Sequence, residues 1–365
     1  MDFAKELEQR TSITLGIQHD VSLTSAQPAT TPRFEWTMGV YMVLLCLGSS
    51  LDNWAHFHGM VDQSFFTPWH AVLYGMMALL GVTLGTAALV NVRKGFAWQR
   101  SLPPGYRLSL LGVGLFLVSG IMDLCWHLVF GIEYDTAAYI SPTHLFLLGS
   151  GILAGTGPVR SAWLRLRPSS TRGWSTLGPM LLSAASAVAA LAMFTQFASP
   201  LVNTFAPKTA LMVSSPVGID MNGIEQAFGV AEVIVQTVLL MSILLLLLRT
   251  WKLPYGAVTL LIVLPSAVQA IMVDNYQLIA AVFVVGLIAD VAANRLCPPL
   301  HGYQLYAIGC VVPAMYVGAI DLALWLTVGV GWPPTLVGGS IVYASATGLF
   351  VSFLLDWPLR YTPEV

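Results

Sequence analysis

Charged side chains are scarce in this chain of 365 residues, where Asp, Glu, Lys and Arg make up only 9% and apolar residues make up 56%. The mean hydropathy is +0.74. A chain so poor in charge is typical of a polytopic membrane protein and excludes an ordinary soluble domain. The chain also lacks a stripe of basic residues that would indicate a nucleic-acid partner. We therefore predict an all-α integral membrane protein whose main partner is the lipid bilayer.

Motifs of several common protein classes are also missing. The chain has no Walker motif, no glycine fingerprint of a dinucleotide site and no zinc-protease HExxH, so none of these chemistries is indicated. The four cysteines have no CxxC or CxxCH spacing, which argues against a disulfide framework and haem attachment. The first 34 residues are polar and contain no short apolar core, so we expect no removed signal peptide.

Long apolar segments dominate the rest of the chain and predict its topology. A spanning helix needs about 20 apolar residues. By this measure we predict ten spans, at residues 36–57, 69–90, 108–130, 142–164, 177–197, 224–248, 257–273, 277–293, 305–327 and 335–355. With the N terminus inside, fifteen of the sixteen Lys and Arg residues fall in cytoplasmic segments. We thus expect a protein of the bacterial cytoplasmic membrane with both termini in the cytoplasm.

A polar pattern occurs twice in the first half of the chain. In each copy Asp and His stand four residues apart and are followed by Ser or Thr, Pro and a second His: Asp52, His56, Thr67, Pro68 and His70, then Asp123, His127, Ser141, Pro142 and His144. Glycine follows the second His at its fifth and eleventh positions in both copies, at Gly75 and Gly81 and at Gly149 and Gly155. We interpret this as a duplicated helical hairpin formed by helices 1–2 and 3–4.

The duplication divides the chain into four parts. Residues 1–34 form a cytoplasmic N-terminal segment, residues 35–165 the duplicated hairpins, residues 166–356 the remaining spans, and residues 357–365 a cytoplasmic tail. A degenerate third copy is predicted in helices 9–10. There Gly318 precedes Asp321 as Gly120 precedes Asp123, but Trp325 stands in place of the histidine, and Leu336 in place of the second histidine.

Helix geometry predicts that each hairpin brings its Asp and two His residues together. Residues four apart lie on one face of a helix. Ser or Thr at the N-cap and Pro at the first helical position put the second His in the first turn of the next helix. We therefore predict two metal sites on the periplasmic side, one formed by Asp52, His56 and His70, the other by Asp123, His127 and His144.

Two other interpretations of this pattern are a buried Asp–His hydrogen-bond network that fixes the helix packing and a proton relay. Ionisable groups at membrane depth cost several kcal/mol unless they are paired or functional. A purely structural role gives little reason for the same three residue types at matching positions in both hairpins. Metal binding is the interpretation that the duplication favours.

Three protein ligands leave coordination positions open, which suits copper, zinc or non-haem iron. Asp-x3-His followed by a His on the next helix resembles the copper site in the C subunit of particulate methane and ammonia monooxygenases. This resemblance covers only the two short stretches. It implies that Asp52, His56 and His70 form one copper triad, and that Asp123, His127 and His144 form a second.

Three classes of function fit such sites. The first is a copper-dependent oxidoreductase acting on a small or lipophilic substrate, and the second is non-enzymatic copper binding, sensing or transport. The third is a metal-dependent hydrolase, which needs a carboxylate base such as Glu225 or Asp62. We expect two mononuclear sites rather than one dinuclear centre, because each hairpin supplies three ligands. No oligomeric state is predicted.

Further carboxylates occur near the same membrane face. We interpret Asp62, Glu133 and Asp135 as solvated loop charges. Glu232 lies deep in the sixth predicted span, where an ionisable residue is a functional candidate by default. It either supports the metal site or bonds a neighbouring helix.

Overall fold

The computed structural model describes residues 26–60, 67–131, 133, 135–165, 173–203, 221–296 and 298–356. These ranges contain helices and no strand: α2 (Pro32–Phe57), α3 (Pro68–Arg93), η1 (Trp98–Arg100), α4 (Arg107–Phe130), α5 (Asp135–Ile140), α6 (Pro142–Gly155), α7 (Gly157–Arg165), α8 (Trp174–Phe194), η2 (Gln196–Ala198), α9 (Met221–Thr250), α10 (Ala257–Met272), α11 (Tyr276–Arg295), α12 (Tyr303–Thr327) and α13 (Pro334–Asp356). The all-α prediction is confirmed.

Eight of the described helices are long and apolar enough to cross a membrane: α2, α3, α4, α8, α9, α11, α12 and α13. The protein is therefore a polytopic integral membrane protein. Two of the ten predicted spans are not among these eight helices. The seventh is α10, which has only 16 residues, and the fourth is divided into α6 and α7.

The division between α6 and α7 has a local cause. Pro158 has no backbone N–H and cannot donate to the carbonyl of Ala154, so a continuous helix would lose one of its hydrogen bonds here. Thr156 ends α6 with φ −86° and ψ 19°. Gly155 allows Met42 of α2 to approach so closely that a Cβ at this position would collide with the Met42 sulfur.

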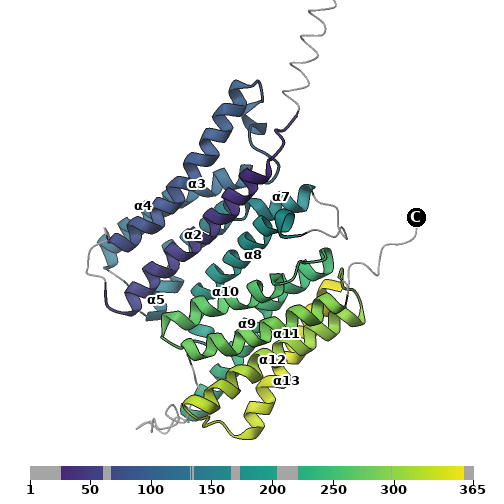
Figure 1. The fold of residues 1–365 in the computed structure, drawn as a ribbon. Helices are drawn as coiled ribbons and strands as arrows, with labels where there is room; N and C mark the ends of the chain where they lie inside the picture. The colour runs from purple at the N-terminus through teal and green to yellow at the C-terminus, as the bar shows by residue number, and fades with distance from the viewer. Residues whose placement is uncertain are drawn as a thin grey trace, which may run out of the picture.

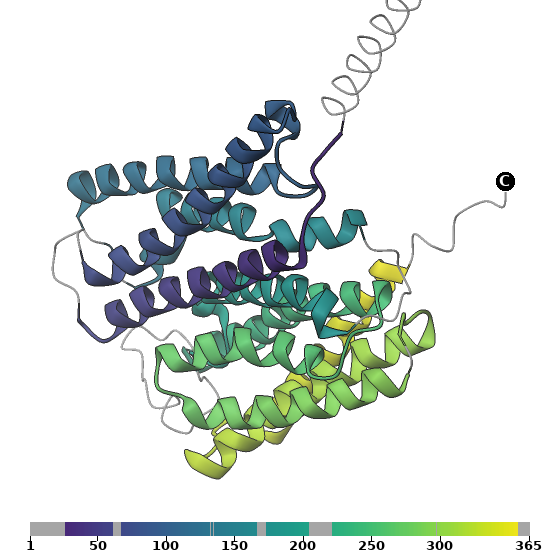
Figure 2. The ribbon, with the colours of Figure 1, turned by 45° about the horizontal axis from the view of Figure 1, so that its top comes forward.

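The helices pack in two groups, and each group has its own buried apolar cluster. One buried apolar cluster draws mainly on α2, α3, α4 and α6, and a larger one mainly on α8 to α13. The hairpins α2–α3 and α4–α6 lie on one side of the molecule, and the hairpin α12–α13 lies on the other (Figures 1 and 2). Helix α8 packs against both α2 and α10 and so joins the two groups.

Basic residues gather at one end of the bundle, the end at which α2 begins and α13 ends (Figure 1). The described Lys and Arg residues lie at or near this end: Arg33, Arg93, Lys94, Arg100, Arg107, Arg160, Arg165, Arg249, Lys252 and Arg295. Asp52 and Asp123 lie near the opposite helix ends. The site residues are thus separated from the basic residues by the length of the bundle.

A buried carboxylate ties the basic end together. Glu35 of α2 accepts hydrogen bonds from the hydroxyls of Tyr106 and Ser161, both 2.7 Å, and from Nη2 of Arg165 at 2.8 Å. Arg165 therefore forms an ion pair with Glu35, a carboxylate that is only 6% exposed.

Close packing of α4 against α6 gives a prediction about stability. A Cβ at Gly112 of α4 would lie 2.8 Å from Cα of Ala154 in α6, whereas a Cβ at Gly114, two residues along, meets nothing within 4 Å. Gly112→Val should therefore destabilise the protein by about 1–3 kcal/mol through overpacking. Gly114→Val is the matched control and should be close to neutral. Thermal unfolding in detergent measures both variants, and equal midpoints for the two would contradict this packing.

Candidate metal centre

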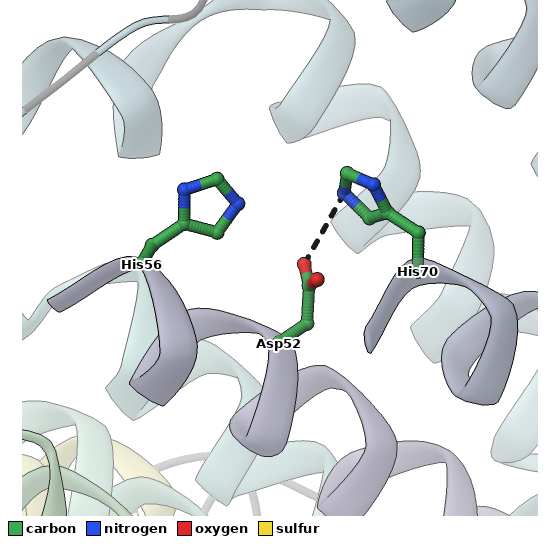
Figure 3. A group of neighbouring side chains, drawn as sticks. All are labelled: Asp52, His56 and His70. Carbon is green, nitrogen blue, oxygen red and sulfur yellow. Dashed lines mark ion pairs between the residues drawn. The ribbon is translucent and has the colours of Figure 1, made fainter. Parts of the chain in front are cut away.

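The first Asp/His/His group lies where α2 ends and α3 begins. Asp52 and His56 are one helical turn apart on α2. Thr67 caps α3, its hydroxyl accepting the backbone N–H of His70 at 3.1 Å, and Pro68 opens the helix as predicted. Nε2 of His70 lies 3.3 Å from Oδ2 of Asp52. His56 and His70 flank Asp52 on the same side of the two helices (Figure 3).

The second group joins α4 to α6 in a similar way. Nε2 of His127 lies 3.5 Å from Oδ2 of Asp123, and Nε2 of His144 lies 3.4 Å from Oδ1. The hydroxyl of Thr143 donates to Oδ1 of Asp123 at 2.8 Å. Asp123 is 1% exposed, so its carboxylate is held in place by partners rather than by water.

The cap of α6 differs from the prediction in one respect. Ser141 stands at the N-cap position, but its hydroxyl makes no cap hydrogen bond to the backbone. It lies instead 2.8 Å from Nδ1 of His144. This contact fixes the ring with Nε2 directed at Asp123, which is the way in which outer partners orient histidine ligands at metal sites.

The separations of the donor atoms fit a metal ion in both groups. In each group one donor atom per residue can be chosen so that all three lie within 4.8 Å of one another. Two ligands about 2.0–2.1 Å from a tetrahedral metal lie about 3.4 Å apart. The Asp–His separations of 3.3 to 3.5 Å agree with that value.

Hydrogen bonding within the first group leaves polar atoms without partners. The ring nitrogens of His56 make no hydrogen bond to a described residue, and Oδ1 of Asp52 is buried and has none either. An Asp–His network that served packing alone would satisfy these atoms, because a buried polar group without a partner costs about 1–3 kcal/mol. A bound metal ion would satisfy them.

Both groups line one cavity of about 290 Å³. The rest of its lining is largely apolar and includes Met42, Leu45, Phe116, Leu147 and Met193. Tyr139 of α5 also lines it and donates to Oδ1 of Asn53 on α2 at 2.7 Å. The arrangement places two three-ligand groups around a single space that could admit a small molecule.

Glu133 belongs to this site, although we interpreted it from the sequence as a solvated loop charge. Its Oε1 accepts the Trp126 indole N–H at 2.8 Å, its Oε2 lies 3.5 Å from Nδ1 of His144, and it lines the cavity. A loop residue has no helical periodicity, so the sequence offered no signal for this position. Asp62 and the side chain of Asp135 lie outside the described residues.

The other carboxylates considered from the sequence lie elsewhere. Neither Glu225 nor Glu232 lines the cavity between the two groups. Glu232 accepts a hydrogen bond from Nδ2 of Asn203 at 3.1 Å and lines a separate small cavity with Asp321. Among the two interpretations of Glu232, the structure supports bonding to a neighbouring segment.

His58 is near the first group in sequence but is engaged elsewhere. Its Nδ1 lies 2.8 Å from the Trp54 carbonyl and its Nε2 lies 3.1 Å from Oδ2 of Asp274. The hydrogen bond to Trp54, aided by Asp274, raises the pKa of His58. Hydrogen bonds from Tyr276 and His58 lower the pKa of Asp274. His58 is therefore a suitable control for changes to His56.

The chain is an integral membrane protein with two Asp/His/His groups that can hold metal ions. Comparison with known proteins adds no relative from which a function could be transferred. No protein-family model, curated protein or solved structure matches this chain.

Proposed function

We propose that this chain is a membrane copper-binding protein that holds one ion in each Asp/His/His group, at the outer face of the bacterial cytoplasmic membrane. The observation that carries the proposal is the first group, where one donor atom from each of the three residues lies within 4.8 Å of the others, and where His56 and Oδ1 of Asp52 have no hydrogen-bond partner among the described residues. The second group repeats the same ligand types, and both of its histidines lie within 3.5 Å of Asp123.

The ligand types support copper among the possible metals. Two imidazoles and a carboxylate suit copper, zinc and non-haem iron, and a given site of this kind binds Cu²⁺ most tightly of the divalent first-row ions. The resemblance of Asp-x3-His plus a following His to the copper site of the monooxygenase C subunit points to the same metal. Zinc and iron are distinguished from copper by the experiment below.

Elemental analysis tests this proposal directly. Protein purified in mild detergent, exposed to equal amounts of copper, zinc and iron salts and then freed of unbound metal should retain two copper ions per chain. Acidification should release them, because the ligands bind as neutral imidazole and carboxylate. Retention of zinc or iron in preference to copper would contradict the choice of metal, and retention of no metal would contradict the site.

A second function, catalysis, is favoured by the shared cavity. Three protein ligands leave each metal with open positions, and the apolar wall suits a small or lipophilic substrate. A copper-dependent oxidoreductase is the class we propose. Azide added to the copper-loaded protein should change the electron paramagnetic resonance spectrum by binding an open position, whereas unchanged spectra would favour storage or transport in closed sites.

The orientation of the chain gives a further prediction. Basic residues favour the cytoplasmic side, so the end that carries Asp52 and Asp123 should face outward. Cysteines introduced at the exposed positions Met60 and Val328 should react with a membrane-impermeant thiol reagent in intact cells, and one at the exposed Lys94 should not. Labelling of the parent protein measures the contribution of the native cysteines, which is then subtracted. Labelling at Lys94 with none at Met60 and Val328 would place the metal groups on the cytoplasmic face.

A further inference from the structure

A second and much smaller cavity, of about 20 Å³, lies among α9, α12 and α13. Glu232 of α9 and Asp321 of α12 line it, together with Trp332 from the segment between α12 and α13. Asn203 and Ser340 also line it, and its other described lining residues carry no ionisable group. None of these residues lines the cavity of the metal centre.

Three of the lining residues each have a buried polar atom without a hydrogen-bond partner among the described residues: Oε2 of Glu232, Oδ2 of Asp321 and Nε1 of Trp332. Glu232 is 3% exposed and Trp332 is 7% exposed. Two of the atoms belong to carboxyl groups, which accept, and the third is an indole N–H, which only donates. Their common occupant must therefore both donate and accept hydrogen bonds.

One water molecule meets this requirement. It can accept the Trp332 N–H through its oxygen and donate an O–H to a carboxyl group that lines the cavity. A cavity needs about 10–15 Å³ to hold a water molecule, so 20 Å³ has room for one. A bare metal cation fits less well, because the indole N–H would direct its positive end toward the ion.

The negative charge of Glu232 and Asp321 must then be balanced. Among the described residues that line the cavity, none is Lys, Arg or His, so two ionised carboxylates would line one cavity with no cationic side chain beside them. Of the other polar groups on the packed elements, Gln236 is engaged by the carbonyls of Thr195 and Ala198. Neutralising a buried carboxylate by a proton costs far less than burying it unpaired.

We propose that Glu232 and Asp321 form a proton-binding site, in which at least one of the two carboxyl groups holds a proton taken from water and Trp332 donates to a water molecule in the cavity. In the predicted third hairpin Asp321 stands where the first two hairpins have their metal-binding Asp. The histidines are missing there, and Glu232 from α9 supplies the second group. The third hairpin would thus bind a proton where the other two bind metal.

Carbodiimide labelling tests this site independently of any metal. Dicyclohexylcarbodiimide reacts with protonated carboxyl groups in apolar surroundings, and mass spectrometry of the digested full-length protein locates the adduct. We expect an adduct on Glu232 or Asp321 at neutral pH, and its loss in the double variant Glu232→Gln, Asp321→Asn. Glu35 is the internal control. It is also buried, but both of its carboxyl oxygens accept hydrogen bonds, from Tyr106 on one side and from Ser161 and Arg165 on the other, so it should remain unlabelled.

Further outcomes decide between a proton and a metal ion at this position. Trp332→Phe removes the N–H that orients the water, so labelling should persist to higher pH. Absence of labelling on both carboxyl groups at neutral pH would overturn the proposal. Protection of the pair by added Na⁺ or Ca²⁺ would also overturn it and show a cation site. Copper content should be the same in the double variant and the parent.

Discussion

Replacing His56 and His127 together with alanine should remove both bound copper ions from the purified protein. Each change leaves its group with one Asp and one His, which is fewer than the three protein ligands of an open metal site. The fold should survive, because both side chains line the cavity rather than a packed seam between helices. Elemental analysis after copper loading measures the loss, and circular dichroism with size-exclusion chromatography verifies the fold.

His58→Ala is the matched control for this double variant. The residue is two positions from His56 but contacts Trp54 and Asp274 instead of Asp52. Its removal should leave the copper content unchanged. Full copper content in the double variant would refute the assignment of both groups. Loss of copper from His58→Ala would show that the first site is formed by other ligands.

Some parts of the metal centre could be predicted from the sequence because they depend on helix spacing and helix capping, which involve residues close together in the chain. The four-residue spacing put Asp52 and His56 on one face, and Pro68 and Pro142 open their helices where the N-cap rule placed them. The sequence also predicts that the two copies lie at the same end of the bundle, since each belongs to a hairpin with the same direction. These features depend on residues within about twenty positions of each other.

Contacts between distant segments could not be predicted in the same way. Glu133 reaches His144 from a loop, and Glu35 meets Arg165 only because α2 packs against α7. Likewise, no periodicity in the sequence places Glu232 and Asp321 at one cavity. In each case the packing of one helix on another decides the contact, and apolar patterns in a membrane protein say little about which helices are neighbours.

The repeat itself stays a prediction, although the glycines behave alike in both copies. The first glycine after the second histidine, at Gly75 and Gly149, faces no atom within 4 Å, whereas the second, at Gly81 and Gly155, meets a side chain of a neighbouring helix. The copies differ in their helices, because α3 is continuous while the second copy is broken after Gly155. A duplicated pattern therefore need not give identical helices.

Changing His70 alone to alanine should halve the copper content, from two ions per chain to one. Asp52 and His56 would remain on α2 but would lack the ligand from α3, while Asp123 keeps both of its histidine neighbours. The test is a sharp one because both groups line the same cavity, so a shared dinuclear centre is the natural alternative.

The mirror variant His144→Ala supplies the matched measurement on the second group and should also retain one ion. Electron paramagnetic resonance of the remaining Cu²⁺ in each variant should then show a single mononuclear species. The two variants should differ in their spectra because Glu133 lies beside the second group. Loss of all copper from either single change would show that the six residues act as one centre, since one ligand would then be necessary for both ions.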